Sequence, residues 1–91
     1  KDTFRRVVLV QYPRKDCWSI AFVTHEQPAA FSEAIGRPVV NVFIPAAPAP
    51  TSGFILQVPP EEIRETKLKV SEALALLMSF GAVIPKPEDQ A

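Results

Sequence analysis

The sequence is poor in the residues from which catalytic, metal and phosphate sites are usually built. It has one cysteine (Cys17), one histidine (His25) and three widely spaced glycines among 91 residues. A single cysteine cannot form an internal disulfide, which favours a reducing compartment such as the cytoplasm. Three separated glycines cannot form a glycine-rich phosphate loop. From these absences we expect no cofactor, no metal ion and no small-molecule ligand.

An excess of charge and long hydrophobic runs are missing as well. Ten basic and ten acidic side chains give a formal net charge of zero. This balance argues against a nucleic-acid partner, because nucleic-acid surfaces are usually basic. It also leaves little charge repulsion to oppose self-association. No run of 18 apolar residues occurs, so we do not expect this stretch to span a membrane.

Proline, by contrast, is plentiful and concentrated in one segment. The chain has ten prolines, and residues 44–54 read Ile-Pro-Ala-Ala-Pro-Ala-Pro-Thr-Ser-Gly-Phe. Each proline fixes its own φ and pushes the residue before it into the extended region, so most of this segment is preset. We call residues 45–52 the proline loop. We expect a stiff connection that is too long for a two-residue hairpin turn.

Apolar, β-branched runs predict four strands. Arg5–Tyr12 and Cys17–Thr24 flank a Pro-Arg-Lys-Asp turn, in which Asp16 tolerates a left-handed conformation, and together they predict a hairpin. Two further strands, Val39–Ile44 and Phe54–Val58, lie on either side of the proline loop. The sheet is therefore expected to consist of two hairpin-like pairs.

Two segments show helical patterns. Between residues 70 and 80, apolar side chains recur at helical spacing, with Ser71 as the expected N-terminal cap and Gly81 as the stop. A short helix is also predicted within residues 25–38, ended by Gly36. The first of these is the only long helix that the sequence predicts.

The expected fold class is α+β: a strongly twisted, partly barrel-like sheet of four to five strands with one main C-terminal helix. A single domain is expected over residues 1–91. Residues 61–66 fit either one helical turn opened by Pro60 or a short edge strand.

All four strands are apolar on both faces, while one helix covers about one face. The sheet must therefore curl, be capped by residues 25–38, or meet another subunit or a lipid surface; we expect a coiled sheet with a self-association surface.

No group of reactive side chains stands out, and we expect no enzyme. His25 has no second ligand at metal-binding spacing and is interpreted as a solvated loop residue. Ser52 lies in Thr-Ser-Gly rather than in Gly-x-Ser-x-Gly. Its hydroxyl is expected to bond to the backbone of the turn, with Gly53 at positive φ. Cys17 is interpreted as a small, buried side chain.

Basic residues gather near the start of the chain and at the hairpin tip. Arg14 and Lys15 occupy the tip, and Arg5 and Arg6 open the first strand. Such side chains can contact anionic lipid headgroups, at about 1 kcal/mol per residue. The interpretation we favour is that these charges keep strand ends from pairing with other chains.

Three stretches together resemble the DUF502 family, membrane proteins of bacteria and plants whose plant members are called LCV or COV-like. They are residues 7–24, residues 42–59 and the Met-Ser-Phe-Gly of residues 78–81. The Tyr-Pro-Arg-Lys-x-x-Trp-Ser turn and the Pro-x-Pro-Thr-Ser-Gly-Phe loop are the most specific parts. The resemblance implies a pair of hydrophobic membrane segments before residue 1, so that this chain, which begins with Lys1, is the soluble domain. It implies no reaction.

These observations predict a soluble, membrane-proximal interaction or oligomerisation domain of a DUF502-like membrane protein, with itself or another protein as partner. The full-length protein is expected in the membrane, with this domain on the cytoplasmic side by positive-inside logic. The alternative is a hydrolase or transferase subunit that acts on a lipid or envelope substrate through Ser52 or His25. The candidate contact residues lie in the hairpin tip and the proline loop: Tyr12, Arg14, Trp18, Pro48, Pro50, Thr51 and Ser52.

Overall fold

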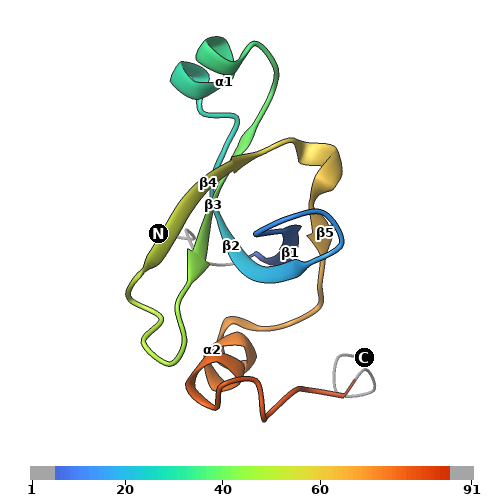
Figure 1. Ribbon diagram of the computed structural model, residues 1–91, viewed down its shortest axis with the longest axis vertical. Helices are drawn as coiled ribbons and strands as arrows, with labels where there is room; N and C mark the ends of the chain where they lie inside the picture. Colours follow the sequence, from blue (N-terminus) through green and yellow to red (C-terminus); the bar gives the residue numbers. More distant parts are fainter. Residues whose placement is uncertain (1–5, 87–91) are drawn as a thin grey trace.

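The computed structural model describes residues 6–86 and has an α+β architecture, with one five-stranded antiparallel sheet and two α-helices (Figure 1). The strand order is β4-β3-β2-β1-β5. The elements in chain order are β1 (Val7–Gln11), β2 (Trp18–Glu26), α1 (Ala29–Ile35), β3 (Val40–Pro45), β4 (Gly53–Val58), a 3₁₀ turn (Pro60–Glu62), β5 (Arg64–Glu65) and α2 (Val70–Met78).

The predicted hairpin of β1 and β2 is confirmed. Val7 pairs with Phe22 and Gln11 with Trp18, and the register between them is continuous. The turn is closed by the Tyr12 N–H, which donates to the carbonyl oxygen of Cys17 at 2.9 Å. Asp16 has a φ of 69°, the left-handed conformation that aspartate tolerates better than most residues. We call residues 12–17 the hairpin tip.

One face of the sheet, the inner face, is buried without any helix over it. Its core consists only of strand residues, and neither helix contributes to it. The rings of Tyr12, which directly follows β1, and Phe54 of β4 even meet, since their centroids are 5.7 Å apart. Two strands separate β1 from β4, and in a flat sheet such strands would lie roughly 14 Å apart. The sheet therefore curls so that the inner face buries itself; its core residues are Val8, Val10, Ala21, Val23, Val40, Val42, Ile44 and Val58.

The curl does not close the sheet, so the expected partly barrel-like closure is wrong. Within residues 6–86, β4 and β5 are the two edges, and no pairing joins them. β5 has only two residues and follows Pro59, Pro60 and a 3₁₀ turn. Because proline has no N–H to donate and a two-residue strand forms little ladder, this segment cannot extend to meet β4. Both alternatives predicted for residues 61–66 occur, one after the other.

The opposite face, the helix face, packs against α2. Ala73 of the helix is fully buried together with Val7 and Phe22 of the sheet. The expected cap at Ser71 is wrong, because the N-cap is Lys69, whose N–H donates to the Glu72 carboxylate at 2.9 Å. The helix is the last element of residues 6–86, but it does not lie at their end, because residues 79–86 follow it without further helix or strand.

The short helix α1 joins β2 to β3 and stands away from the sheet (Figure 1). It ends as predicted at Gly36, whose φ is 91° and whose N–H donates to the Ser32 carbonyl at 2.9 Å. None of its residues is buried. The segment at residues 25–38 therefore does not cap the sheet. Among residues 6–86, neither helix has the length and hydropathy that a bilayer crossing requires.

Candidate interaction surface

The topology brings the hairpin tip and the proline loop to the same end of the sheet. β1 and β3 both pair antiparallel with β2 and so run in the same direction. The connections that follow them must then emerge at one end. The Tyr12–Phe54 ring contact links the two segments directly, because Tyr12 opens the tip and Phe54 lies just after the loop. Two segments that are distant in the sequence thus become neighbours.

The proline loop is closed by hydrogen bonds between its own residues. The Ala46 N–H donates to the Ser52 carbonyl at 2.7 Å, and the Ser52 N–H donates to the Ala49 carbonyl at 3.2 Å. The Ser52 hydroxyl also donates to Ala49, at 3.4 Å. Gly53 follows with a φ of 156°, as predicted. The loop is therefore a fixed shape, and the hydroxyl of Ser52 belongs to that shape.

Gly53 is required by a close approach of two backbones. A Cβ atom at this position would lie 2.0 Å from the carbonyl oxygen of Ile44. No side chain fits at that distance, so only glycine allows β3 and β4 to meet here. This contact fixes the direction in which the loop leaves the sheet.

A groove of about 280 Å³ separates the proline loop from α2. Phe22 and Phe43 are register partners on the helix face and lie side by side on β2 and β3. Ligand pockets usually begin at about 300 Å³, so this space suits one or two side chains of a protein better than a large ligand. We call it the loop groove; it is lined by Phe22, Phe43, Pro50, Thr51, Val70 and Leu74.

Exposed apolar side chains border the loop groove. Ile55 of β4 is 68% exposed and is the register partner of Phe43. Met78 of α2 is 62% exposed and lies one helical turn after Leu74. Clusters of exposed apolar side chains around a concave site are typical of contact surfaces. Met78 is one of the apolar residues that recur at helical spacing between residues 70 and 80.

The candidate contact residues in and beside the hairpin tip do not form one surface. Trp18 pairs with Gln11 on the helix face, where the Arg64 guanidinium lies 5.4 Å from the centre of its ring. Tyr12 is the next residue along β1 and packs with the inner-face core. Neighbouring residues of a strand point to opposite faces. Of the two aromatic candidates, Tyr12 is therefore near the proline loop, whereas Trp18 faces β5.

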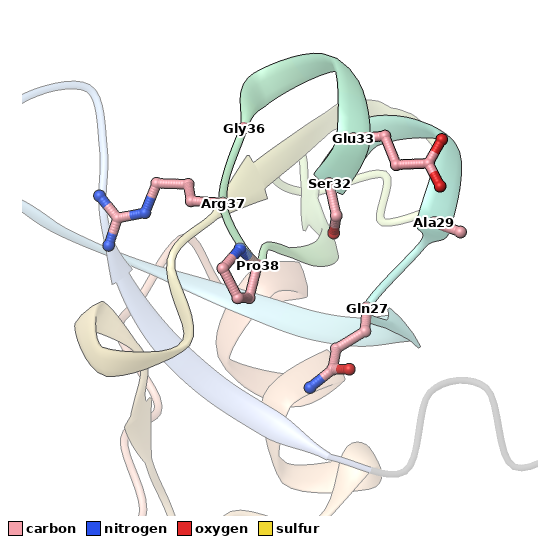
Figure 2. Close-up of a pocket in the computed structure, with 7 residues that line it drawn as sticks. All are labelled: Gln27, Ala29, Ser32, Glu33, Gly36, Arg37 and Pro38. Atoms are coloured by element: carbon pink, nitrogen blue, oxygen red, sulfur yellow. The ribbon is translucent and has the colours of Figure 1, made fainter.

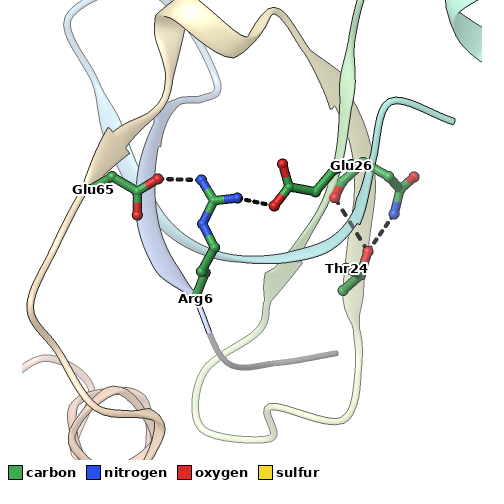
Figure 3. Close-up of polar contacts among 5 residues, drawn as sticks. Arg6, Thr24, Glu26 and Glu65 are labelled. Carbon is green, nitrogen blue, oxygen red and sulfur yellow. Dashed lines mark hydrogen bonds and ion pairs between the residues drawn. The ribbon is translucent and has the colours of Figure 1, made fainter. Parts of the chain in front are cut away.

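Arg6, one of the basic residues near the start of the chain, has a structural role. Figure 3 shows its guanidinium between the carboxylates of Glu65 on β5 and Glu26 on β2. The hydrogen bond to Glu65, together with that to Glu26, raises the pKa of Arg6 above its usual value despite partial burial. Arg6 is thus engaged by two carboxylates of the fold, although its side chain is still 38% exposed. Arg5 and Lys1 lie outside the described residues, while Arg14 is exposed at the tip.

The residues of the enzymatic alternative lie at different ends of the sheet. His25 is paired with Asn41 near the start of β3, whereas Ser52 follows the end of that strand. Pro45 lies four positions after Asn41 along the strand, a span of roughly 13 Å. Near His25, Thr24 and Asn41 share hydrogen bonds, and Gln57 donates to Asn41. The structure does not bring Ser52 and His25 together.

A second hollow, of about 510 Å³, lies beside α1 (Figure 2). In the figure the charged groups of Glu33 and Arg37 point away from one another. Arg37 is also engaged by the Glu61 carboxylate. Binding pockets usually hold a few polar groups that converge, so this hollow is the weaker candidate. Its lining residues are Gln27, Ala29, Ser32, Glu33, Gly36, Arg37 and Pro38.

The sequence indicates the proline loop as a contact region, but it does not indicate the α2 side of the groove. The helical spacing of Val70 and Leu74 predicts an apolar stripe, but it does not show which stripe residues border the loop. Their place depends on how α2 packs on the sheet. Among residues 6–86, no group of three or more metal-ligating side chains is assembled.

The fold and the groove together define a small α+β domain with an apolar surface beside a stiff loop. Comparison with protein families gives a match to the family model "Protein of unknown function (DUF502)" over residues 1–52. The match covers more than half of the chain, and the chain belongs to this family. It includes the hairpin and the proline loop. No curated protein and no solved structure matches the chain.

Proposed function

We propose that this chain is the membrane-proximal interaction domain of a DUF502 membrane protein, and that the loop groove receives apolar side chains of a protein partner. The observation that carries the proposal is the groove itself. Its walls are apolar, and its rim includes Pro50 and Thr51 of a loop whose shape is fixed by internal hydrogen bonds. A preformed site of this kind binds with less loss of conformational freedom than a flexible loop would.

The chemistry of the groove supports a protein as the occupant. Phe22, Phe43 and Leu74 offer apolar contact without charge, and the size suits single side chains. Interface cores are depleted of charged residues and enriched in aromatic ones. Exposed Ile55 and Met78 extend the apolar area beyond the groove. A partner would therefore insert one or two apolar side chains and rest on this rim.

The membrane attachment and the cytoplasmic side of the proposal rest on the resemblance to the family and on composition. The single cysteine and the basic residues at the start of the chain favour the cytoplasmic face. A reporter fused to the C-terminus of the full-length protein should then be active in the cytoplasm. Activity only outside the cytoplasm would contradict this part of the proposal.

Site-specific photo-crosslinking tests the groove. We would place a photoreactive residue at Thr51 in the full-length protein, in its own membrane. As a control, the same residue replaces Glu33 on α1, which lies at the opposite end of the sheet from the loop (Figure 1). We expect an adduct of defined mass from position 51 and none from position 33. Equal adducts from both positions, or none from position 51, would refute the proposal.

A matched pair of helix variants tests whether the groove binds the partner. Leu74→Gln places a polar side chain in the groove, whereas Ala75→Gln makes the same change in the exposed neighbour. Leu74→Gln should abolish the adduct from position 51, and Ala75→Gln should keep it. Circular dichroism checks that both variants remain folded. An adduct that survives Leu74→Gln would show that the partner binds elsewhere.

Alanine substitutions separate this proposal from the enzymatic alternative. Ser52→Ala removes only a hydroxyl that bonds within the loop, and His25→Ala changes an exposed residue far from the groove. Binding should survive both changes, as measured by the same adduct. If either change abolished a measurable turnover of a lipid or envelope substrate while the adduct persisted, the enzymatic alternative would be favoured.

A further inference from the structure

The two edges of the sheet differ in how well they are protected against pairing with another strand. β5 has two residues, both charged, and follows two prolines. Short length, charge and proline are the features by which edge strands avoid pairing. β4 has none of them: Gly-Phe-Ile-Leu-Gln-Val is six residues long and carries no charge and no proline. Among residues 6–86, one edge is therefore shielded, and the other is open.

The backbone groups at the open edge follow from the register between β3 and β4. The pairing is continuous from Val40↔Val58 to Pro45↔Gly53, and the Ala46 N–H donates to Ser52 in the next step. Antiparallel pairs alternate between hydrogen-bonded and non-hydrogen-bonded. Because Ala46 and Ser52 form a hydrogen-bonded pair, every second pair from there is also hydrogen-bonded, and these pairs include Phe54 and Leu56 of β4. Ile55 and Gln57 belong to the pairs in between. Their N–H and C=O groups are therefore directed away from β3, toward the open edge. They are the groups that a further strand would meet.

We propose that the open edge of β4 pairs antiparallel with β4 of a second copy of this chain. The strand has no charge, and the chain has no net charge, so two copies meet without repulsion at this edge. An antiparallel pair of identical strands is two-fold symmetric, and the outward groups of Ile55 and Gln57 in one copy meet the same groups in the other. This proposal does not depend on the loop groove.

The side chains of β4 favour the same partner. Phe54 lies on the inner face and is 57% exposed, while Ile55 lies on the helix face and is 68% exposed. Pairing places a second β4 beside both, so that apolar side chains meet across the two-fold axis on each face. The buried inner face then continues from one copy into the other.

The size of the edge sets the strength of the dimer. β4 contributes six residues, whereas a stable interface has about 20–30 residues a side. A strand pair of this size is marginal by itself. We therefore expect a weak dimer of the isolated chain, with a dissociation constant on the order of 0.1 mM.

Sedimentation equilibrium with two matched variants tests the proposal. The wild-type chain should show a monomer–dimer equilibrium as its concentration is raised to about 1 mM, ten times the expected constant. Ile55→Lys places a charge on the open edge and should weaken the dimer by at least about tenfold. Met78→Lys makes the same change at a similarly exposed position on α2 and should leave the dimer intact. A wild-type monomer at every concentration, or equal weakening by both variants, would overturn the proposal; weakening by Met78→Lys alone would place the contact at the loop groove.

Amide hydrogen exchange followed by NMR provides a test that needs no substitution. The amides of Phe54 and Leu56 are directed toward β3 and should be protected at all concentrations. The amides of Ile55 and Gln57 should exchange fast in dilute solution and become protected as the dimer forms. Exchange of these two amides that does not change with concentration, whether fast or slow, would contradict pairing with a second copy.

Discussion

At the residue scale, backbone geometry determines where the proline loop begins and ends. The carbonyl of Ile44 lies so close to Gly53 that a Cβ atom there would be 2.0 Å away. At Gly36, by contrast, a Cβ atom would meet nothing within 4 Å, although φ is also positive. The two glycines therefore separate two effects, the cost of a positive φ and the cost of a steric clash.

Alanine substitutions at these glycines should have different effects on stability. Gly36→Ala should lower the free energy of unfolding by about 1–2 kcal/mol, the cost of a left-handed conformation. Gly53→Ala adds a backbone clash and should cost about 3 kcal/mol or more, because the strands must move apart. Urea denaturation of both variants measures the difference. Equal losses would mean that the close approach at Gly53 does not exist in solution.

The sequence was a good guide to single residues where local chemistry decides. Asp16, Gly36 and Gly53 all adopt the positive φ that the turn and cap patterns predict. The cap of α2 lies at Lys69 rather than at the predicted Ser71, because the Lys69 N–H donates to the Glu72 carboxylate. The Thr66 hydroxyl holds the segment before the helix against the sheet, since it donates to the Val7 carbonyl at 2.6 Å. Ser71, a good cap by type, lies too late.

At the element scale, α2 stabilises the helix face through a few buried side chains. Leu77 is buried, whereas its neighbour Met78 is 62% exposed. Leu77→Ala should lower the free energy of unfolding by about 2–4 kcal/mol, because it removes buried methyl groups and leaves a cavity. Met78→Ala should change it by less than about 0.5 kcal/mol. Thermal or urea unfolding checks this; a small effect at Leu77 would mean that α2 does not pack as described.

The curl of the sheet depends on contacts between strands that are not neighbours. Tyr12 and Phe54 meet although two strands lie between β1 and β4. A double-mutant cycle with Tyr12→Ala and Phe54→Ala should therefore give a coupling energy of about 0.5–1.5 kcal/mol, typical of aromatic pairs. A coupling near zero would indicate that the rings are apart and the sheet is flatter.

The elements were predictable from periodicity, but their arrangement was not. Two apolar faces on every strand indicated a curled sheet, and the self-buried inner face agrees with that. Closure into a barrel did not follow, because the second edge is only the Arg64–Glu65 pair. Alternation along the first strand places Gln11 and Tyr12 on opposite faces. Only the register, in which Trp18 pairs with Gln11, shows that Trp18 lies on the face opposite Tyr12.

At the scale of the whole molecule, a rigid scaffold carries the two proposed contact regions. The loop groove lies between the proline loop and α2, on the helix face. The open edge of β4 lies beside it and offers backbone groups rather than a cavity. A groove for side chains and an edge for a strand recognise different partners. We therefore propose a protein partner for the groove and a second copy of this chain for the edge.

The most direct test of the proposed function replaces the proline loop in the full-length protein. Residues 46–51 would be exchanged for a glycine-serine segment of the same length, which keeps Pro45, Ser52 and Gly53 but removes the fixed shape of the groove rim. Purification from the native membrane, with and without this change, then compares the bound proteins, while circular dichroism of the chain checks the fold. We expect a partner that co-purifies with the wild-type protein and is lost from the folded variant. The same partner in equal amount with both proteins would contradict it.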